Sequence, residues 1–363
     1  MRAILAIAAL MLLAACAPLK QQIGTPGAGF LGPRLEDSDF ISFDGARLGM
    51  QHWDAPGEPW AVVVGLHGMN DYSNAFHLAA EHWAGEGITT YAFDLRGFGR
   101  SPQRGVWAGA GLMDDDLRTI TTLVRQRFPH AIIAVAGVSM GGAVAIDAFA
   151  SDRPPAADRL VLLSPAVWGW SSQPLSSRVA LWTAAHTVPG FQLNPPGFIT
   201  DHMRASDNTD ELIRMGRDPN LLWGARMDAL YGLMNLMQKG WKETGELKVP
   251  TLYAYGAKDQ IIPKPAAFHA AAALPAGDRT AYYADGYHLL LIDLQNPKVW
   301  DDVAAFIRSP SAPLPSGAPP IPRSQAAHPY PVMARLDRAT QAESTSETGG
   351  AGRSLGSPGQ AGR

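Results

Sequence analysis

The sequence predicts an α/β fold with a mostly parallel sheet, and three observations support this. Short uncharged runs of Val, Ile, Ala and Leu recur between residues 60 and 166 and again from residue 251, as expected of buried parallel strands. Segments with helical periodicity alternate with these runs, which is the order of βαβ units. A chain of 363 residues with 46% hydrophobic and 17% charged residues can bury one large core or two modest ones.

The first 15 residues are predicted to be a secretory signal. Arg2 precedes an apolar run that ends at Ala15 and is too short to span a membrane. The following site, Leu13-Ala14-Ala15-Cys16, resembles the lipobox of bacterial lipoproteins, which implies that Cys16 is lipidated and begins the mature chain. The alternative is an ordinary signal peptide with an incidental cysteine.

Cys16 is also the only cysteine of the chain, so no intrachain disulfide can form. Ala17 follows it, where an aspartate would be the usual signal for retention in the inner membrane. We therefore expect a protein of the bacterial cell envelope that is attached to a membrane by its lipid, with the outer membrane favoured.

The remaining chain divides by composition into a tether, a folded domain and a tail. Residues 16–37 are rich in Gly and Pro and predict a tether. Residues 38–308 predict the α/β domain, which begins with a hairpin about Asp44-Gly45. Residues 309–363 combine many prolines, glycines and serines with few large apolar side chains, so we expect this tail to be disordered.

Gly137-Val138-Ser139-Met140-Gly141 matches the pattern G-x-S-x-G between a predicted strand, Ala131–Gly137, and a predicted helix. This context places a serine hydroxyl above the edge of the sheet, on a turn where only glycines fit against the neighbouring strand and helix. Ser139 is therefore the candidate nucleophile.

A serine hydroxyl needs a base to take its proton and an acid to orient that base. Hydrolases with this turn supply the partners in the order serine, acid, histidine. Asp259 follows the predicted strand that begins at Thr251, and His288 lies in the loop after the last predicted strand. Asp285 and Asp293 are alternatives for the acid, but Asp285 is close enough to His288 in sequence to belong to its turn.

Two backbone N–H groups are expected to stabilise the oxyanion. Met140, directly after the candidate nucleophile, supplies one, and Met69 in the turn after the strand Trp60–Leu66 is the best candidate for the other. His67 in that turn is interpreted as a brace rather than a base. Asp94 and Arg96 are expected to tie loops together.

The acidic run at residues 114–116 predicts no metal site, because consecutive residues of a helix point in different directions. No metal or organic cofactor is expected anywhere in the chain. A net charge of −3 and a pI near 6.4 also do not indicate the basic surface that nucleic-acid binding requires.

Between about residues 167 and 247 the alternation of strands and helices stops, and a Trp- and Met-rich helical segment replaces it. An insertion after this strand lies where a lid would cover the site. Its large apolar residues either pack within the insertion or line an apolar substrate channel. The candidates for channel lining are Trp168, Trp170, Trp182, Trp223, Met227 and Met234.

Five segments together resemble the α/β-hydrolase superfamily and, within it, the monoacylglycerol lipase and lysophospholipase group. They are H-G-M-N-D-Y-S at 67–73, F-D-L-R-G-F-G-R-S at 93–101, G-V-S-M-G-G at 137–142, Y-G-A-K-D at 255–259 and G-Y-H at 286–288. The resemblance covers roughly residues 38–308 and implies a triad of Ser139, Asp259 and His288, with Met69 and Met140 as oxyanion donors, acting on an acyl ester.

The sequence therefore predicts a serine esterase for small, lipid-like acyl esters such as monoacylglycerols or lysophospholipids. Two alternatives stay open. A peptidase of the prolyl-aminopeptidase type would use the same triad and would need carboxylates in the lid to hold an amino group. A lipoprotein that binds lipid without catalysis would retain only the fold.

Overall fold

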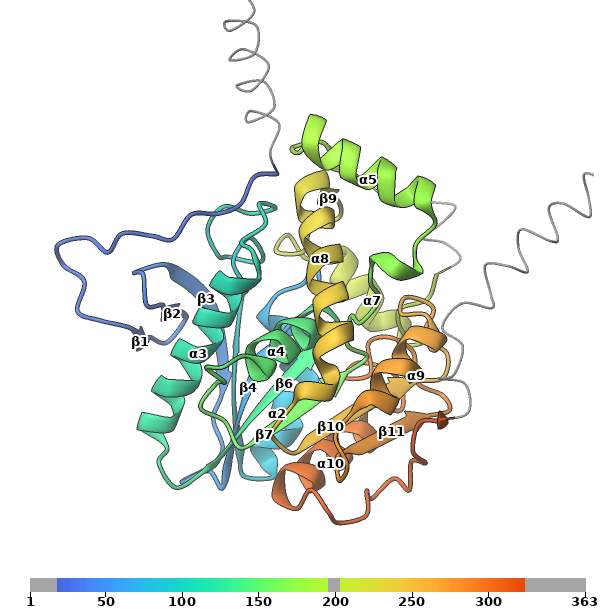
Figure 1. Cartoon of the computed structure of the whole chain (residues 1–363). Coiled ribbons are helices and arrows are strands. Elements are labelled where there is room, and N and C mark those ends of the chain that lie inside the picture. The colour runs from blue at the N-terminus through green and yellow to red at the C-terminus, as the bar shows by residue number, and fades with distance from the viewer. Residues whose placement is uncertain (1–17, 195–202, 324–363) are drawn as a thin grey trace, which may run out of the picture. The chain divides into compact units, whose positions relative to one another are not determined.

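The computed structural model describes residues 18–194 and 203–323, and its core is a nine-stranded sheet (Figure 1). The strand order is β1-β2-β3-β5-β4-β6-β7-β10-β11. All pairings from β5 to β11 are parallel, whereas β1, β2 and β3 pair antiparallel at one side. The predicted α/β class with a mostly parallel sheet is confirmed. Its strands are β1 (Arg34–Leu35), β2 (Asp39–Ile41), β3 (Arg47–Trp53), β4 (Ala61–Leu66), β5 (Ile88–Phe93), β6 (Ile132–Val138), β7 (Arg159–Leu163), β10 (Thr251–Gly256) and β11 (Arg279–Tyr283).

Helices cover both faces of this sheet, which explains why the central strands are apolar throughout. In β4, the side chains of Val62, Val64 and Leu66 belong to one buried cluster, and those of Ala61 and Val63 belong to the other. The first cluster is completed by α3 (Ala110–Arg127), α4 (Met140–Ala150) and α9 (Lys264–Ala273). The second is completed by η1 (Ser73–Phe76), α2 (His77–Gly85) and α10 (Asn296–Arg308).

The insertion at residues 167–247 forms a mainly helical cap on this domain. It contains η2 (Trp170–Ser172), α5 (Leu175–Thr187), α7 (Thr209–Gly216), α8 (Met227–Glu243) and η3 (Thr244–Glu246), with a small ribbon of β8 (Gln192–Leu193) and β9 (Ala225–Arg226). The long helix α8 packs along α4 (Figure 1), with Gly240 beside Ala143. The cap is therefore seated on the helix that follows Ser139.

The predicted tether is partly docked on the domain. The N–H of Gln21 donates to the carbonyl of Trp107 at 2.9 Å, and the N–H of Gly24 donates to the Asp44 carboxylate at 2.8 Å. Further along, Arg34–Leu35 pairs with β2. These positions of the predicted tether are therefore held against the domain, because a turn-rich sequence can still hydrogen bond to neighbouring loops. Residues 1–17, which include Cys16 and the predicted signal, lie outside the described residues.

The prediction of disorder is wrong for residues 309–323, which run along the domain as a strap. Leu314 and Ile321 are buried, and the carbonyl of Pro319 accepts from the N–H of Tyr282 in the edge strand β11 at 2.8 Å. Further hydrogen bonds join the strap to Arg279 and Thr280 of β11 and to Asp302 of α10. These bonds and the buried apolar side chains order a segment whose composition is that of a disordered tail. The rest of the predicted tail, residues 324–363, lies outside the described part of the chain.

Among the helices of the described residues, none is both long and apolar enough to cross a membrane.

Candidate active site

Ser139 occupies a strained turn at the junction of β6 and α4. Its φ of 51° and ψ of −115° lie outside the regions that L-residues normally adopt. Hydrogen bonds to the segment at the end of β7 hold this conformation: Ser139 N–H donates to the Leu163 carbonyl at 3.0 Å, and Ala166 N–H donates to the Ser139 carbonyl at 2.9 Å. Strain of this kind persists only where the surroundings over-determine it, and it is common at functional sites.

The glycines on either side of Ser139 are required by close backbone approach. A Cβ at Gly137 would lie 2.6 Å from the carbonyl oxygen of Gly141. A Cβ at Gly141 would collide with the carbonyl oxygen of Leu66 at the end of β4. The pattern G-x-S-x-G therefore reflects two backbone crossings that place the serine between the ends of the central strands.

Asp259 and His288 lie in the loops after β10 and β11, and their side chains meet. His288 Nδ1 donates to Asp259 Oδ2 at 2.9 Å, with the two side chains 5% and 0% exposed. The other carboxylate oxygen, Oδ1, accepts from the N–H groups of Ile261 at 2.7 Å and Ile262 at 3.0 Å. With Nδ1 carrying the proton, His288 leaves Nε2 as the ring atom that can accept one.

Two glycines, which sequence reasoning did not single out, let these loops approach. A Cβ at Gly256 would lie 2.5 Å from the carbonyl carbon of Gly286. The N–H of Lys258 donates to the Gly286 carbonyl at 2.8 Å and ties the loops together. The available signal was the glycine that precedes each functional residue, in Y-G-A-K-D and in G-Y-H.

The two alternative acids have other partners. Asp285 is exposed and pairs with Lys258 at 2.9 Å. Asp293 accepts from the backbone N–H of Tyr287 at 2.6 Å, and burial raises the pKa of its carboxyl to about 6. Neither carboxylate bonds the His288 ring, so the geometry favours Asp259 as its partner.

The turn after β4 passes directly beside Ser139. A Cβ at Gly68 would lie 3.3 Å from the Cβ of Ser139. Within residues 18–194 and 203–323, no hydrogen bond uses the backbone N–H of Met69 or of Met140. Two free backbone donors on the two segments that flank a serine are what an oxyanion hole requires.

His67 braces this turn and is not available as a base. Its Nδ1 donates to the Gly68 carbonyl at 2.7 Å, and its Nε2 accepts from Leu95 N–H at 2.9 Å. Complete burial lowers the pKa of the ring to about 4, so the imidazole is neutral in the folded protein. Both ring nitrogens therefore hydrogen bond to backbone groups that follow two strands, β4 and β5. This agrees with the interpretation of His67 as a brace.

Asp94 and Arg96 tie loops together as predicted. The Asp94 carboxylate accepts from the N–H groups of Ser73 at 2.9 Å and Arg100 at 2.8 Å. Arg96 is 3% exposed and bonds the carboxylates of Asp44 and Asp116, which joins the first hairpin to α3. These contacts hold together the loops that follow β4 and β5.

The three carboxylates of the acidic run on α3 do not share one partner. Asp116 bonds Arg96, whereas Asp115 and Asp114 pair with Arg118 at 2.7 and 3.8 Å. In the described part of the chain, no three His, Cys, Asp or Glu side chains are grouped so that they could hold a metal ion.

The candidate channel-lining residues are dispersed over the cap. Trp170 and Trp182 lie together in an apolar groove between η2, α5 and α8, where Tyr231 also lines the wall. Trp168 packs against the core, Met227 is buried, Met234 is half-buried, and Trp223 is 62% exposed. The structure therefore brings two of the six together in one groove, and a channel lined by them stays a prediction.

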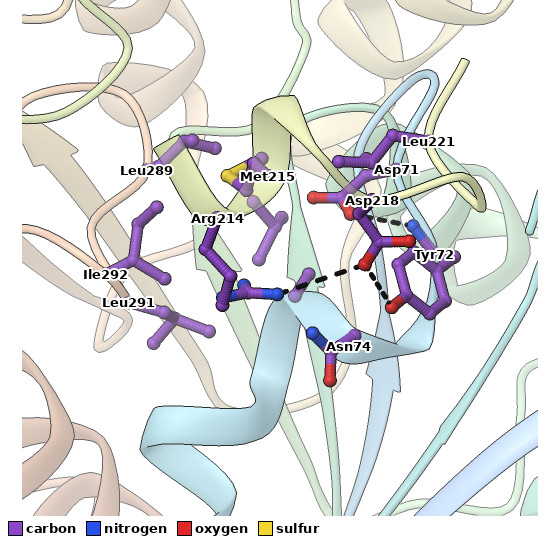
Figure 2. A pocket seen from close by; sticks show the side chains of 12 residues that line it. Asp71, Tyr72, Asn74, Arg214, Met215, Asp218, Leu221, Leu289, Leu291 and Ile292 are labelled. Atoms are coloured by element: carbon purple, nitrogen blue, oxygen red, sulfur yellow. Dashed lines mark hydrogen bonds and ion pairs between the residues drawn. The ribbon is translucent and has the colours of Figure 1, made fainter. Parts of the chain in front are cut away.

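A second pocket, which sequence reasoning missed, lies between the turn at residues 71–75, helix α7 and the loop after His288. Figure 2 shows its polar wall, formed by Asp71, Tyr72, Arg214 and Asp218. Its apolar wall includes Val138 and Leu289, which are the chain neighbours of Ser139 and His288. Burial raises the pKa of Asp71 to about 7. Two of the quoted motifs contribute residues to its walls, but the rest come from segments far apart in the sequence, so no single motif predicts the pocket.

A comparison with protein families matches residues 57–295 to the family described as serine aminopeptidase, S33. The monoacylglycerol lipase of Mycolicibacterium smegmatis is 28% identical over 285 residues, which cover 75% of this chain and 97% of that protein. The monoglyceride lipase of Rattus norvegicus is 26% identical over 267 residues, which cover 72% of this chain and 86% of that protein.

Solved structures show the same fold. The monoacylglycerol lipase of Paleococcus ferrophilus superposes with a TM-score of 0.59 at 22% identity, covering 72% of this chain and 98% of that one. A soluble variant of monoglyceride lipase from Saccharomyces cerevisiae, in complex with a substrate analog, superposes with a TM-score of 0.62 at 15% identity. The match covers 80% of this chain and 98% of that one.

Proposed function

This chain belongs to the family described as serine aminopeptidase, S33, and we propose that within this family it is a serine hydrolase of lipid-like carboxylic esters. Its substrates are monoacylglycerols or lysophospholipids, and the reaction proceeds through an acyl-enzyme. Relatives named monoacylglycerol lipase and monoglyceride lipase match along almost their whole length, which supports an ester rather than a peptide substrate.

One observation carries the proposal: the strained Ser139 and the bonded pair of Asp259 and His288 follow three strands of one parallel sheet. The carboxyl ends of such strands meet at the same edge, where ligands of α/β folds bind. In the proposed reaction, His288 Nε2 takes the Ser139 hydroxyl proton while Oγ attacks the ester carbonyl carbon.

The remaining steps use the same groups. The N–H groups of Met69 and Met140 stabilise the oxyanion of the tetrahedral intermediate. As the ester C–O bond breaks, His288 returns the proton to the departing alcohol, which leaves an acyl group on Ser139. Water then attacks this acyl-enzyme with His288 again as base, and a carboxylic acid is released.

The surface of the cap supports a lipid-like acyl group. Helix α5 has a single buried residue, Ala185, and exposes Leu175, Val179 and Trp182 at helical spacing. Such an exposed apolar surface is typical of contact with lipid or with apolar ligands. It agrees with an enzyme that takes acyl chains from an interface.

The peptidase alternative needs free carboxylates in the cap to bind a substrate amino group. Asp218 accepts from Tyr72, Glu211 pairs with Arg214 and Asp228 pairs with Arg226. Asp207 accepts from the N–H of Leu294 at 2.8 Å. Because these acids have partners, the cap favours the esterase over an aminopeptidase.

The decisive experiment is labelling of the full chain with a fluorophosphonate probe, followed by hydrolysis of p-nitrophenyl esters of graded chain length beside aminoacyl anilides. We expect covalent labelling at Ser139, turnover of the esters and loss of both in Ser139→Ala. A protein that remains unlabelled, or a Ser139→Ala variant with full esterase activity, contradicts the proposal. Faster turnover of the anilides supports the peptidase, and tight lipid binding without turnover supports the non-catalytic lipoprotein.

We further propose that Cys16 carries a lipid that anchors the enzyme in the bacterial cell envelope, in the outer membrane. The lipobox-like sequence supports this placement. Metabolic labelling with an alkyne fatty acid should mark the wild-type chain in a bacterial host and leave Cys16→Ala unlabelled. Equal labelling of the two chains, or none in either, contradicts the anchor.

A further inference from the structure

We infer that residues 204–222 of the cap, here called the clamp segment, fix the position of the turn after β4 relative to the loop after His288. The turn, residues 67–72, carries the N–H of Met69 and is here called the oxyanion turn. Tyr72 and Asp218 are positioning residues for this purpose. The inference rests on the proposed function, because it concerns the placement of the Met69 N–H relative to Ser139 and His288. It assigns the cap a role beyond covering the substrate.

The clamp segment is bonded to the oxyanion turn at two points. The N–H of Leu222 donates to the carbonyl of Asn70 at 2.9 Å. The hydroxyl of Tyr72 donates to Asp218 Oδ2 at 2.6 Å, a contact visible on the polar wall in Figure 2. One bond falls on the residue directly after Met69 and the other lies three residues after it.

These bonds matter because they fix the backbone of the turn around Asn70. Its φ of 65° is a left-handed conformation, which asparagine adopts more readily than most residues other than glycine. A main-chain bond to the Asn70 carbonyl fixes the peptide plane that follows this residue. Without that restraint the turn can shift, and the N–H of Met69 then leaves the position in which it can meet an oxyanion.

The same segment is bonded to the loop after His288. The N–H of Leu289 donates to the carbonyl of Ala205 at 2.9 Å, and Asn208 Nδ2 donates to the carbonyl of Ile292 at 2.9 Å. Leu289 is the direct neighbour of His288, so this bond restrains the backbone that carries the imidazole. The clamp segment thus touches two loops that are more than 200 residues apart in the chain.

The clamp segment is itself held in shape between these contacts. Asp218 Oδ1 accepts from the N–H of Asn220 at 2.9 Å, so one carboxylate bonds both Tyr72 and its own turn. Arg104 Nη2 donates to the carbonyls of Pro219 and Asn220, each at 3.0 Å. With both ends and the middle restrained, a shift at Asp218 is transmitted to the oxyanion turn.

Tyr72→Phe tests the inference by deleting only the hydroxyl. We expect kcat on a p-nitrophenyl ester to fall roughly tenfold, a part of the 10²–10³ lost with a whole oxyanion donor. KM should stay within about twofold, because a donor that acts on the developing charge affects the transition state more than substrate binding. The matched control is Tyr91→Phe, which deletes a buried hydroxyl without a hydrogen-bond partner in the described residues.

Two variants of Asp218 separate positioning from general destabilisation. An asparagine side chain at this position can still exchange a hydrogen bond with the Tyr72 hydroxyl, so we expect Asp218→Asn to retain kcat within about threefold. Asp218→Ala should lose at least as much kcat as Tyr72→Phe, because it also removes the acceptor of the Asn220 N–H. Because both variants break the bond between Tyr72 and Asp218, the double variant should lose no more than Asp218→Ala alone.

The possible outcomes are distinct. A wild-type chain that neither labels at Ser139 nor hydrolyses esters overturns the proposed function and this inference with it. An active wild type with unchanged kcat in Tyr72→Phe overturns the inference alone. So do a loss in Asp218→Asn equal to that in Asp218→Ala, multiplicative losses in the double variant, or an equal loss in Tyr91→Phe.

Discussion

Replacement of Asp259 by asparagine should reverse the tautomer of His288 without disturbing the loop. Oδ1 of Asp259 is held by the N–H groups of Ile261 and Ile262, at 2.7 and 3.0 Å, so an amide oxygen has to occupy that position. The amide NH₂ then faces His288 Nδ1, which can only accept from it. The ring proton moves to Nε2, the atom that has to take the proton of Ser139.

The expected effect on catalysis is large, and the effect on stability is small. A wrong histidine tautomer in a Ser-His-Asp triad lowers kcat by about 10⁴, or roughly 5.4 kcal/mol at 1.36 kcal/mol for each factor of ten. The two bonds to the Asp259 loop are retained, so the thermal midpoint should change little. Steady-state hydrolysis of a p-nitrophenyl ester and differential scanning calorimetry measure the two quantities.

Asp293→Asn is the matched control, since that carboxylate also lies near His288 but bonds the Tyr287 backbone. We expect it to retain kcat within about tenfold, because it leaves the tautomer of His288 unchanged. The reasoning is refuted if Asp259→Asn keeps more than a tenth of wild-type kcat, or if Asp293→Asn suffers the larger loss.

Three further results are expected. Burial raises the pKa of Asp114 to about 8, so the folded chain binds this proton more tightly than the unfolded chain does. The free energy of unfolding should therefore fall as the pH rises from 4 to 8. In urea unfolding, Asp114→Asn should show a weaker dependence of this free energy on pH than the wild type. Gly137→Ala should destabilise by about 1–3 kcal/mol through its clash with Gly141, whereas Gly111→Ala, which meets no atom within 4 Å, should not; thermal melts compare them. A chain that ends at residue 308 should unfold at lower urea than one that ends at residue 323, because the buried anchors of residues 309–323 are lost.

The sheet and the turn that carries Ser139 could be predicted because both are marked by short sequence patterns. The central strands β4 and β6 are short apolar runs, and Ser139 lies between two glycines that the backbone crossings require. The candidate partners of Ser139 are inferred from their order along the chain, since parallel strands bring successive strand ends to one edge. The bond between Asp259 and His288 agrees with that reasoning.

Segments ordered by a few contacts with distant residues could not be predicted in this way. The strap at residues 309–323 has the composition of a disordered tail, yet several hydrogen bonds to β11 and α10 and two buried aliphatic side chains order it. The docked tether depends on Gln21 and Gly24 meeting loops that lie far along the chain. Composition reports the average tendency of a segment, whereas these contacts depend on the surface that the rest of the chain presents.

The cap shows why the residues that carry out a reaction are easier to predict than the residues that position them. The candidate triad consists of residue types that the reaction itself demands, so their identity is visible in the sequence. The bond between Tyr72 and Asp218 has no such signal, since Tyr72 lies in the segment H-G-M-N-D-Y-S but nothing in the sequence pairs it with an aspartate 146 residues away, which the fold brings to 2.6 Å. If their bond sets the oxyanion turn, the cap can differ among enzymes with one triad and still control its rate. Selection on the cap then acts on catalysis as well as on the choice of substrate.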